Sequence, residues 1–417
     1  MAVSVPRAAT LVAALLMYTM PALAQTPADT AARRQQRTLD SLAAVVRALQ
    51  ERVDSLLRLR AAGDTSGAAE LEALRAAAAA AGADSAGASR PAQARLGLNA
   101  LNPEISVTTI VHASLIRPGP QTESFDAREF EFSFQSALDP YSYTKIFLSV
   151  TPEEIEVEEG YAYWSGLPGN TRLDVGRMRQ PLGELNRWHR HALPEGELPL
   201  VHQLYLGGVE GLSGTGVSLY APLPFSGRAG SFEWYGQVTK GTNETLYVSG
   251  DRPAFLSALS GFWQLTRATY AMLSISGAHG TNPDTSLTST VAALAARVTW
   301  RPPAEAARRE VTVRGEIFAL RRRFAGVGPT RLGGYVGTQA RLNRRWVAGL
   351  RADYVENPDP VVASHQWETH ASLTFWQSEF VYLRAEWTQH RETLAPTTNR
   401  LSLHAVWAMG PHKHEIF

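Results

Sequence analysis

From about residue 104 to residue 410, apolar and polar side chains alternate with a period of two, and no other feature constrains the fold as strongly. The alternation is clearest over residues 129–135, 311–319 and 346–354. Successive residues of a β-strand face opposite sides, so each of these segments has one apolar and one polar face. The repetition of such segments over three quarters of the chain predicts an all-β fold.

Two β architectures share this pattern, a soluble sandwich with its apolar face inside and a membrane barrel with that face in lipid. The segments have about ten residues, which is the length that crosses a membrane when tilted. Tight and long connections alternate, and large aromatic residues recur near segment ends, as the interfaces of a barrel require. We therefore predict a transmembrane antiparallel β-barrel of about sixteen strands with an aqueous lumen. The aromatic residues are Trp164, Trp300, Trp346, Tyr354, Trp367, Phe375, Trp376 and Trp387.

The N-terminus has the pattern of a secretory signal peptide. Arg7 precedes an apolar stretch that ends at Ala22-Leu23-Ala24, and such a small-residue triplet is a cleavage site. A short membrane anchor is the alternative, but the apolar stretch is short for one. We assign residues 1–24 to the signal peptide, which indicates export toward the outer membrane.

Residues 25–60 read as a helix with apolar residues three and four apart, from Leu39 to Leu56. This spacing predicts a short periplasmic coiled coil, with a helix packed on its own domain as the alternative. Residues 61–103 are rich in Ala, Gly and Ser and are interpreted as a linker. The barrel then occupies residues 104–417.

The longest predicted connection, residues 180–211, holds a His-x-His motif. Three histidines, His189, His191 and His202, are candidate metal ligands, and Zn²⁺ is the candidate cation. The favoured alternative is that this loop folds into the lumen, narrows it and forms a charged filter with the wall. The candidate pore-lining residues are Glu129, Glu131, Glu154, Glu156, Glu158, Asp174, Arg187, Arg190, Arg314, Glu316, Arg351, Asp353, Arg384 and Glu386.

Charge and motifs argue against several classes of function. With 40 basic and 39 acidic residues, the chain is not basic enough for a typical nucleic-acid binder. It has no phosphate-binding Gly-rich loop and no nucleophile elbow, so we expect no enzymatic activity and no cofactor. A hydrolase built on His370 and Ser372 stays as a minor alternative.

Taken together, the signal peptide, the coiled coil, the alternating strands and the C-terminal Phe417 resemble outer-membrane porins, and more loosely the phosphate-selective porin group. The segment from Gly176 to Gly211 also looks like a block of bacterial barrel proteins, some of them labelled zinc-regulated. The resemblance implies passive diffusion of small solutes or ions and a homo-oligomer, often a trimer, in contact with outer-membrane lipid and lipopolysaccharide. The chain departs from the phosphate-selective group in having three lysines rather than a lysine-rich constriction.

We therefore expect a porin narrowed by loop 180–211. One alternative is a structural barrel whose coiled coil tethers the outer membrane to the periplasm. Another is a metal-related outer-membrane transport protein.

Overall fold

A computed structural model describes the barrel part of the chain. The described residues are 103–118, 123–208, 211–224, 230–241, 243, 245–246, 252–281, 288–323, 328–359, 361–393 and 395–410. The predicted signal peptide, coiled coil and linker, and the C-terminal Phe417, lie outside these residues. None of the helices in the described ranges is long and apolar enough to cross a membrane.

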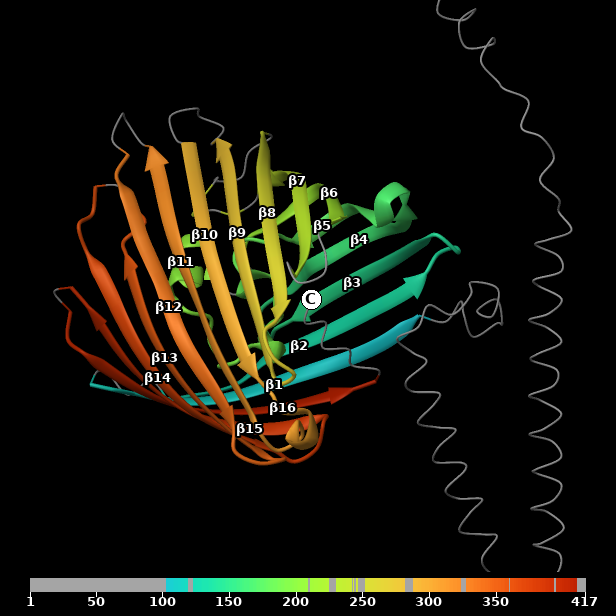
Figure 1. The fold of residues 1–417 in the computed structure, drawn as a ribbon. Helices are drawn as coiled ribbons and strands as arrows, with labels where there is room; N and C mark the ends of the chain where they lie inside the picture. Colours follow the sequence, from blue (N-terminus) through green and yellow to red (C-terminus); the bar gives the residue numbers. More distant parts are fainter. Residues whose placement is uncertain are drawn as a thin grey trace, which may run out of the picture. The chain divides into compact units, whose positions relative to one another are not determined.

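The described residues form sixteen strands in one closed barrel (Figure 1). Each strand pairs with its neighbours in the chain, and β1 pairs antiparallel with β16 from Val107–Met409 to Arg117–Asn399. The predicted sixteen-stranded barrel is therefore confirmed. The strands are β1 Glu104–Arg117, β2 Glu123–Ala137, β3 Ser142–Val150, β4 Ile155–Leu167, β5 Thr171–Arg179, β6 Ser213–Leu223, β7 Ser231–Gly241, β8 Pro253–Gln264, β9 Thr269–Thr281, β10 Thr288–Trp300, β11 Glu310–Arg323, β12 Thr330–Arg341, β13 Trp346–Glu356, β14 His365–Trp376, β15 Val381–Glu392 and β16 Thr398–Met409.

Local side chains close the tight turns at one end of the barrel. Asp139 Oδ1 accepts hydrogen bonds from the backbone N–H groups of Tyr141 at 2.7 Å and Ser142 at 2.8 Å, between β2 and β3. Asn343 Oδ1 accepts equivalent bonds from Arg345 and Trp346, between β12 and β13. Asp and Asn are favoured in turns for this reason. The longest connection, residues 180–212 between β5 and β6, lies at the other end, as the sequence predicts. The two ends do not differ strictly in the length of their connections, because the longer connection 301–309 lies at the tight-turn end and the short connection 151–154 lies at the other.

The faces of the strands are arranged opposite to those of a soluble sandwich. Ile317 is 62% exposed and Leu350 is 59% exposed on the outside, whereas Glu316 and Arg351, one residue away, are buried at 1% and 3%. Exposed apolar side chains are stable only if lipid covers them, because water would penalise that area. The barrel is therefore built to span a membrane, with charged residues inside.

Aromatic pairs stand at both ends of this outer surface. Between β13 and β14, Trp346 and Phe375 lie with ring centroids 5.0 Å apart, and Tyr354 and Trp367 lie 4.6 Å apart at the opposite end. Such girdles mark the two membrane interfaces. Trp376 differs from the prediction, because it packs on the inward-facing Tyr382 at 4.7 Å.

Candidate functional site

Residues 180–212, between β5 and β6, form a loop whose base is closed by hydrogen bonds. The Gln180 N–H donates to the carbonyl of Leu212 at 2.9 Å. The Asn186 amide donates to the carbonyls of both residues, and its oxygen accepts the Leu212 N–H at 2.7 Å. Gly211 has φ +59°, and a Cβ there would lie 2.6 Å from Asn186 Oδ1, so a glycine is needed beside this amide. The loop contains three short helices, η4 Leu185–Arg187, η5 Arg190–Ala192 and α4 Leu200–Tyr205.

One side of the loop is apolar and packs on the inner wall. Leu182, Leu206 and Tyr205 are 0% exposed and belong to one cluster with Phe318 and Leu320 of β11. Burial of this area removes the loop from water and fixes its position. The predicted polar inner face is therefore interrupted on β8, β10, β11 and β13, where Leu256, Val291, Phe318, Leu320 and Val355 face inward.

The rest of the contact between the loop and the barrel wall is polar, and carboxylates of the wall accept hydrogen bonds from the loop backbone. Glu316 accepts hydrogen bonds from the N–H groups of Glu184 at 3.0 Å and Leu185 at 3.1 Å. Asp353 accepts the Leu200 N–H at 3.1 Å, and Glu386 accepts the Gly196 N–H at 2.7 Å. These three carboxylates were predicted to line a pore; the structure makes them anchors of the loop.

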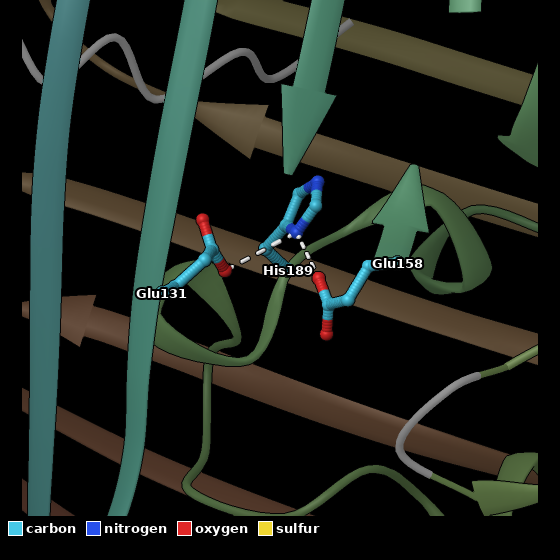
Figure 2. Close-up of side chains that lie close together, drawn as sticks. All are labelled: Glu131, Glu158 and His189. Atoms are coloured by element: carbon cyan, nitrogen blue, oxygen red, sulfur yellow. Dashed lines mark hydrogen bonds and ion pairs between the residues drawn. The ribbon is translucent and has the colours of Figure 1, made fainter. Parts of the chain in front are cut away.

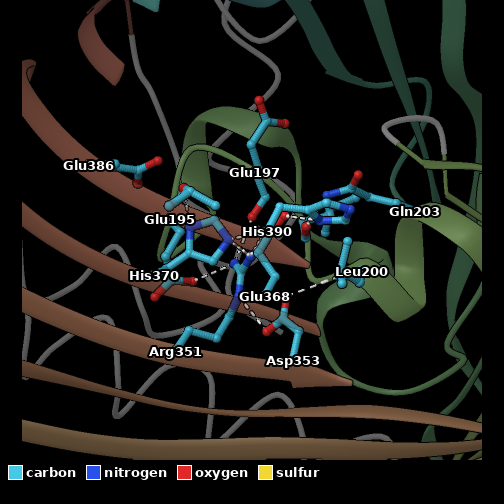
Figure 3. Close-up of polar contacts among 12 residues, drawn as sticks. Glu195, Glu197, Leu200, Gln203, Arg351, Asp353, Glu368, His370, Glu386 and His390 are labelled. Atoms are coloured by element: carbon cyan, nitrogen blue, oxygen red, sulfur yellow. Dashed lines mark hydrogen bonds and ion pairs between the residues drawn. The ribbon is translucent and has the colours of Figure 1, made fainter. Parts of the chain in front are cut away.

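Arg351 on β13 lies at the centre of a network of polar contacts between the wall and the loop (Figure 3). Its Nε donates to Asp353 at 2.9 Å, and its Nη1 donates to Glu195 Oε2 at 3.2 Å and to the Glu197 carbonyl at 2.8 Å. Its Nη2 lies 2.7 Å from His370 Nε2. A single guanidinium thus joins two wall strands to the loop, and its fixed fork of donors suits this role.

Arg384 on β15 binds the loop in the same way. Its Nη2 donates to the carbonyl of Leu193 at 3.2 Å, and its Nε donates to Thr374. The neighbouring Tyr382 hydroxyl donates to the carbonyl of His191 at 2.9 Å. These bonds satisfy loop carbonyls that would otherwise be buried without partners.

Across the lumen, the His-x-His motif meets the carboxylates of β2 and β4 (Figure 2). His189 Nδ1 lies 2.8 Å from Glu158 Oε2 and 3.2 Å from Glu131 Oε2. His191 Nδ1 lies 3.2 Å from the same Glu131 oxygen. Burial lowers the pKa of His189, but Glu131 and Glu158 outweigh this effect, so the pKa stands well above its ordinary value.

His202 lies elsewhere, against β11 and β12. It is fully buried, with Nε2 3.6 Å from Glu316 Oε1 and its ring against Phe318 and Tyr335. Burial, assisted by Arg351, lowers its pKa to about 3, so the ring is neutral. The structure therefore brings His189 and His191 together, but not the predicted set of three histidines, because α4 directs His202 to the apolar cluster.

A β-bulge changes the predicted face of β4. The register of β3 and β4 shifts between Phe147 and Leu148, so both Glu158 and Glu159 are buried inside. A bulge adds one residue and thereby reverses the faces beyond it. Glu159 was missed for this reason, and its carboxylate accepts the Arg179 N–H at 2.8 Å. The placement of Glu154 in the lumen is wrong, because Glu154 lies exposed in the turn before β4.

The remaining predicted charged residues have partners. Glu156 is half-buried and lies 3.1 Å from Arg177. The other contacts are Arg172–Asp174 at 2.6 Å, Arg190–Glu129 at 3.5 Å, Arg187 over the Tyr235 ring at 5.0 Å and Arg314 over the Trp188 ring at 4.9 Å.

Cavities remain on both sides of the loop. One opens toward the tight-turn end, between Trp188 and inward residues such as Arg297 and Arg314. A smaller one lies between α4 and residues such as His390 and Arg400 near the other end.

The fold is similar to solved outer-membrane porins. An anion-selective porin from Comamonas acidovorans matches with a TM-score of 0.54 and 9% identity, over 74% of this chain and 100% of that chain. OprB of Pseudomonas putida matches with a TM-score of 0.53 and 8% identity, over 74% and 94%. The trimer form of OmpT of Vibrio cholerae matches with a TM-score of 0.51 and 7% identity, over 74% and 99%. At such identities the likeness concerns the fold.

No protein-family model matches the chain, and no curated protein matches it.

Proposed function

We propose that this chain is an outer-membrane porin through which small solutes or ions diffuse passively, with loop 180–212 as the narrowest part of the path. The observation that carries the proposal is the anchoring of the loop by three inward-facing wall carboxylates, Glu316, Asp353 and Glu386. A segment held across a sixteen-stranded lumen reduces its cross-section and places charges beside the passing solute.

In this proposal the barrel performs no chemistry. Solutes enter the cavity near α4, pass the loop, and leave through the larger cavity beside Trp188 and Arg297. Acidic and basic side chains both face the path. The loop and the wall therefore produce an electrostatic field across the path, and they do not form a ring of one charge that would admit only ions of the opposite charge.

Export and assembly follow the same proposal. The signal peptide directs the chain to the periplasm, and the apolar outer surface inserts into the outer membrane, in contact with lipid and lipopolysaccharide. The trimer form of OmpT supports a homo-oligomer for this chain as well.

A structural barrel is the second candidate, and the fully buried Leu182, Tyr205 and Leu206 favour it, because an apolar cluster closes part of the lumen. Recording from planar bilayers with the purified full chain distinguishes the two. Stepwise conductance supports the porin, whereas a correctly folded, inserted and silent barrel supports the structural role.

A further inference from the structure

Two clusters of His and carboxylate side chains lie inside the barrel, and they differ in what holds them together. In the first, donor atoms of Asp353, Glu368 and His370 lie within 4.8 Å of one another. The Arg351 guanidinium lies among them, with Nη2 2.7 Å from His370 and Nε 2.9 Å from Asp353 (Figure 3). This cluster already contains a cation of the protein itself.

The second cluster is formed by Glu131, Glu158 and His189, whose donor atoms also lie within 4.8 Å of one another (Figure 2). Here Arg179 binds Glu158 through Oε1, at 3.0 Å. The other oxygen, Oε2, faces His189 together with Glu131 Oε2. The three inward-pointing donor atoms therefore converge on one another, with the guanidinium outside the group.

The distances in the second cluster suit a small cation. Zn²⁺ binds nitrogen at about 2.0 Å, which places neighbouring ligand atoms of a tetrahedral site about 3.3 Å apart. His189 Nδ1 lies 2.8 Å and 3.2 Å from the two carboxylate oxygens. These two separations are therefore close to those between neighbouring ligand atoms of a tetrahedral site.

Buried carboxylates gather around the second cluster. Glu129, Glu131, Glu158 and Glu159 are all buried here, and Arg179 and Arg190 lie 3.0 Å from Glu158 and 3.5 Å from Glu129. Buried carboxylates in a protein are paired or bind a metal ion, so this concentration of them favours a bound cation.

A cavity gives access to the cluster. Glu131, His189 and His191 line a cavity that Tyr161 and Tyr235 of the wall also line. Two of the three proposed ligands, Glu131 and His189, thus border open space, which leaves a fourth coordination position accessible to water or a solute. His191 Nδ1 lies 3.2 Å from the same Glu131 oxygen and helps to orient this carboxylate.

We propose that Glu131, Glu158 and His189 form a binding site for one divalent first-row transition-metal cation, positioned by His191. Mixed imidazole and carboxylate donors favour such a cation over Ca²⁺ or Mg²⁺, which prefer oxygen ligands alone. The site does not require that the barrel conducts.

The test is Zn²⁺ binding to the folded, tag-free full chain in detergent, measured by titration calorimetry, with Co²⁺ absorption as a second probe. We expect one strong site in the wild type and an affinity about 10–100-fold lower in E131Q and H189Q, as loss of a ligand or its support produces. One matched control is H279Q, because His279 faces outward and lies 2.8 Å from the Thr290 hydroxyl, away from the cluster. The other is the double variant H412Q/H414Q, which removes the other His-x-His motif. Both should bind like the wild type.

Absence of Zn²⁺ binding by the wild type overturns the proposal without any variant. Equal affinity in folded E131Q and wild type also overturns it, as does a loss confined to H412Q/H414Q. If H189Q fails to fold, the Co²⁺ spectrum of the wild type decides: intense visible bands indicate a four-coordinate site, and the weak bands of hydrated Co²⁺ reject it. Zn²⁺ binding is measured without a membrane, so its result does not depend on conductance. If the barrel binds Zn²⁺ but does not conduct, the metal site is supported and the porin proposal fails. If the barrel conducts but does not bind Zn²⁺, only the metal site is rejected.

Discussion

Glu316 on β11 accepts a hydrogen bond at 3.1 Å from the backbone N–H of Leu185, a residue that lies 131 positions earlier in the chain. The same carboxylate accepts the Glu184 N–H and the Tyr335 hydroxyl. A residue of the wall thus determines where the loop begins its course through the lumen.

Replacing Glu316 by Ala should loosen the loop. The change leaves two backbone N–H groups and one hydroxyl without their acceptor, and each unpaired buried group costs about 1–3 kcal/mol. Equilibrium unfolding from liposomes in urea should show a lower free energy of unfolding. E310A is the matched control, because Glu310 lies on the same strand and bonds the largely exposed Arg301. Equal stability of E316A and E310A would count against the anchoring role.

The apolar side of the loop should exclude water. The chain has no cysteine, so single cysteines report accessibility without background. Leu206 is 0% exposed, whereas Gln366 lines the cavity beside α4. We expect a membrane-impermeant maleimide to label Q366C quickly and L206C very slowly. Similar rates would show that the cluster does not hold the loop.

The lipid-facing surface can be tested by two leucines of nearly equal exposure. Leu350 lies within β13 and is 59% exposed, and Leu342 lies in the turn before it and is 58% exposed. An Arg on the lipid face near the bilayer centre costs about 2–4 kcal/mol, and much less near an interface. L350R should therefore lower the free energy of unfolding from liposomes, while L342R should leave it nearly unchanged. A reversed order would contradict a membrane-spanning β13.

The ion pair between Arg128 and Glu197, with Nη2 and Oε1 2.5 Å apart, should persist in mild acid. Burial raises the pKa of Glu197, but Arg128, Arg400 and Arg190 outweigh it, so the pKa is below the ordinary value. A carboxylate with a depressed pKa contributes stability above its unfolded pKa of about 4.3 and loses it as pH falls through the folded value.

The stability difference between wild type and E197Q should therefore stay constant from pH 7 to about 5 and shrink below about 4. Chemical denaturation at a series of pH values measures it. A difference that already disappears near pH 6 would contradict this pairing.

Much of the barrel could be predicted from the sequence, because the two faces of a strand follow from the alternation of apolar and polar residues along it. Alternation over β11 and β13 correctly placed Glu316 and Arg351 inside. The β3–β4 bulge could not be predicted in this way, since one added residue changes the face of Glu159 without altering the composition. Glu154 was misplaced because alternation does not show where a strand begins.

The partners of the loop were harder to predict, since they depend on long-range contacts. Phe318 and Leu320 interrupt the alternation of β11, since they are apolar residues at inward-facing positions, and the loop supplies the apolar surface that covers them. The structural role of Asn186 has only a weak signal in the sequence, because Gly211, which packs against its amide, follows much later at the end of the loop. His189 and His191 share a motif, whereas His202 was added by proximity in sequence alone.

The most direct test of the account is single-channel conductance of the wild type beside a variant in which a short Gly-Ser linker replaces residues 180–211. If the loop narrows an aqueous lumen, both proteins conduct stepwise in planar bilayers, and the variant has the larger conductance at the same salt concentration. Equal conductance in two folded, inserted barrels would contradict the account.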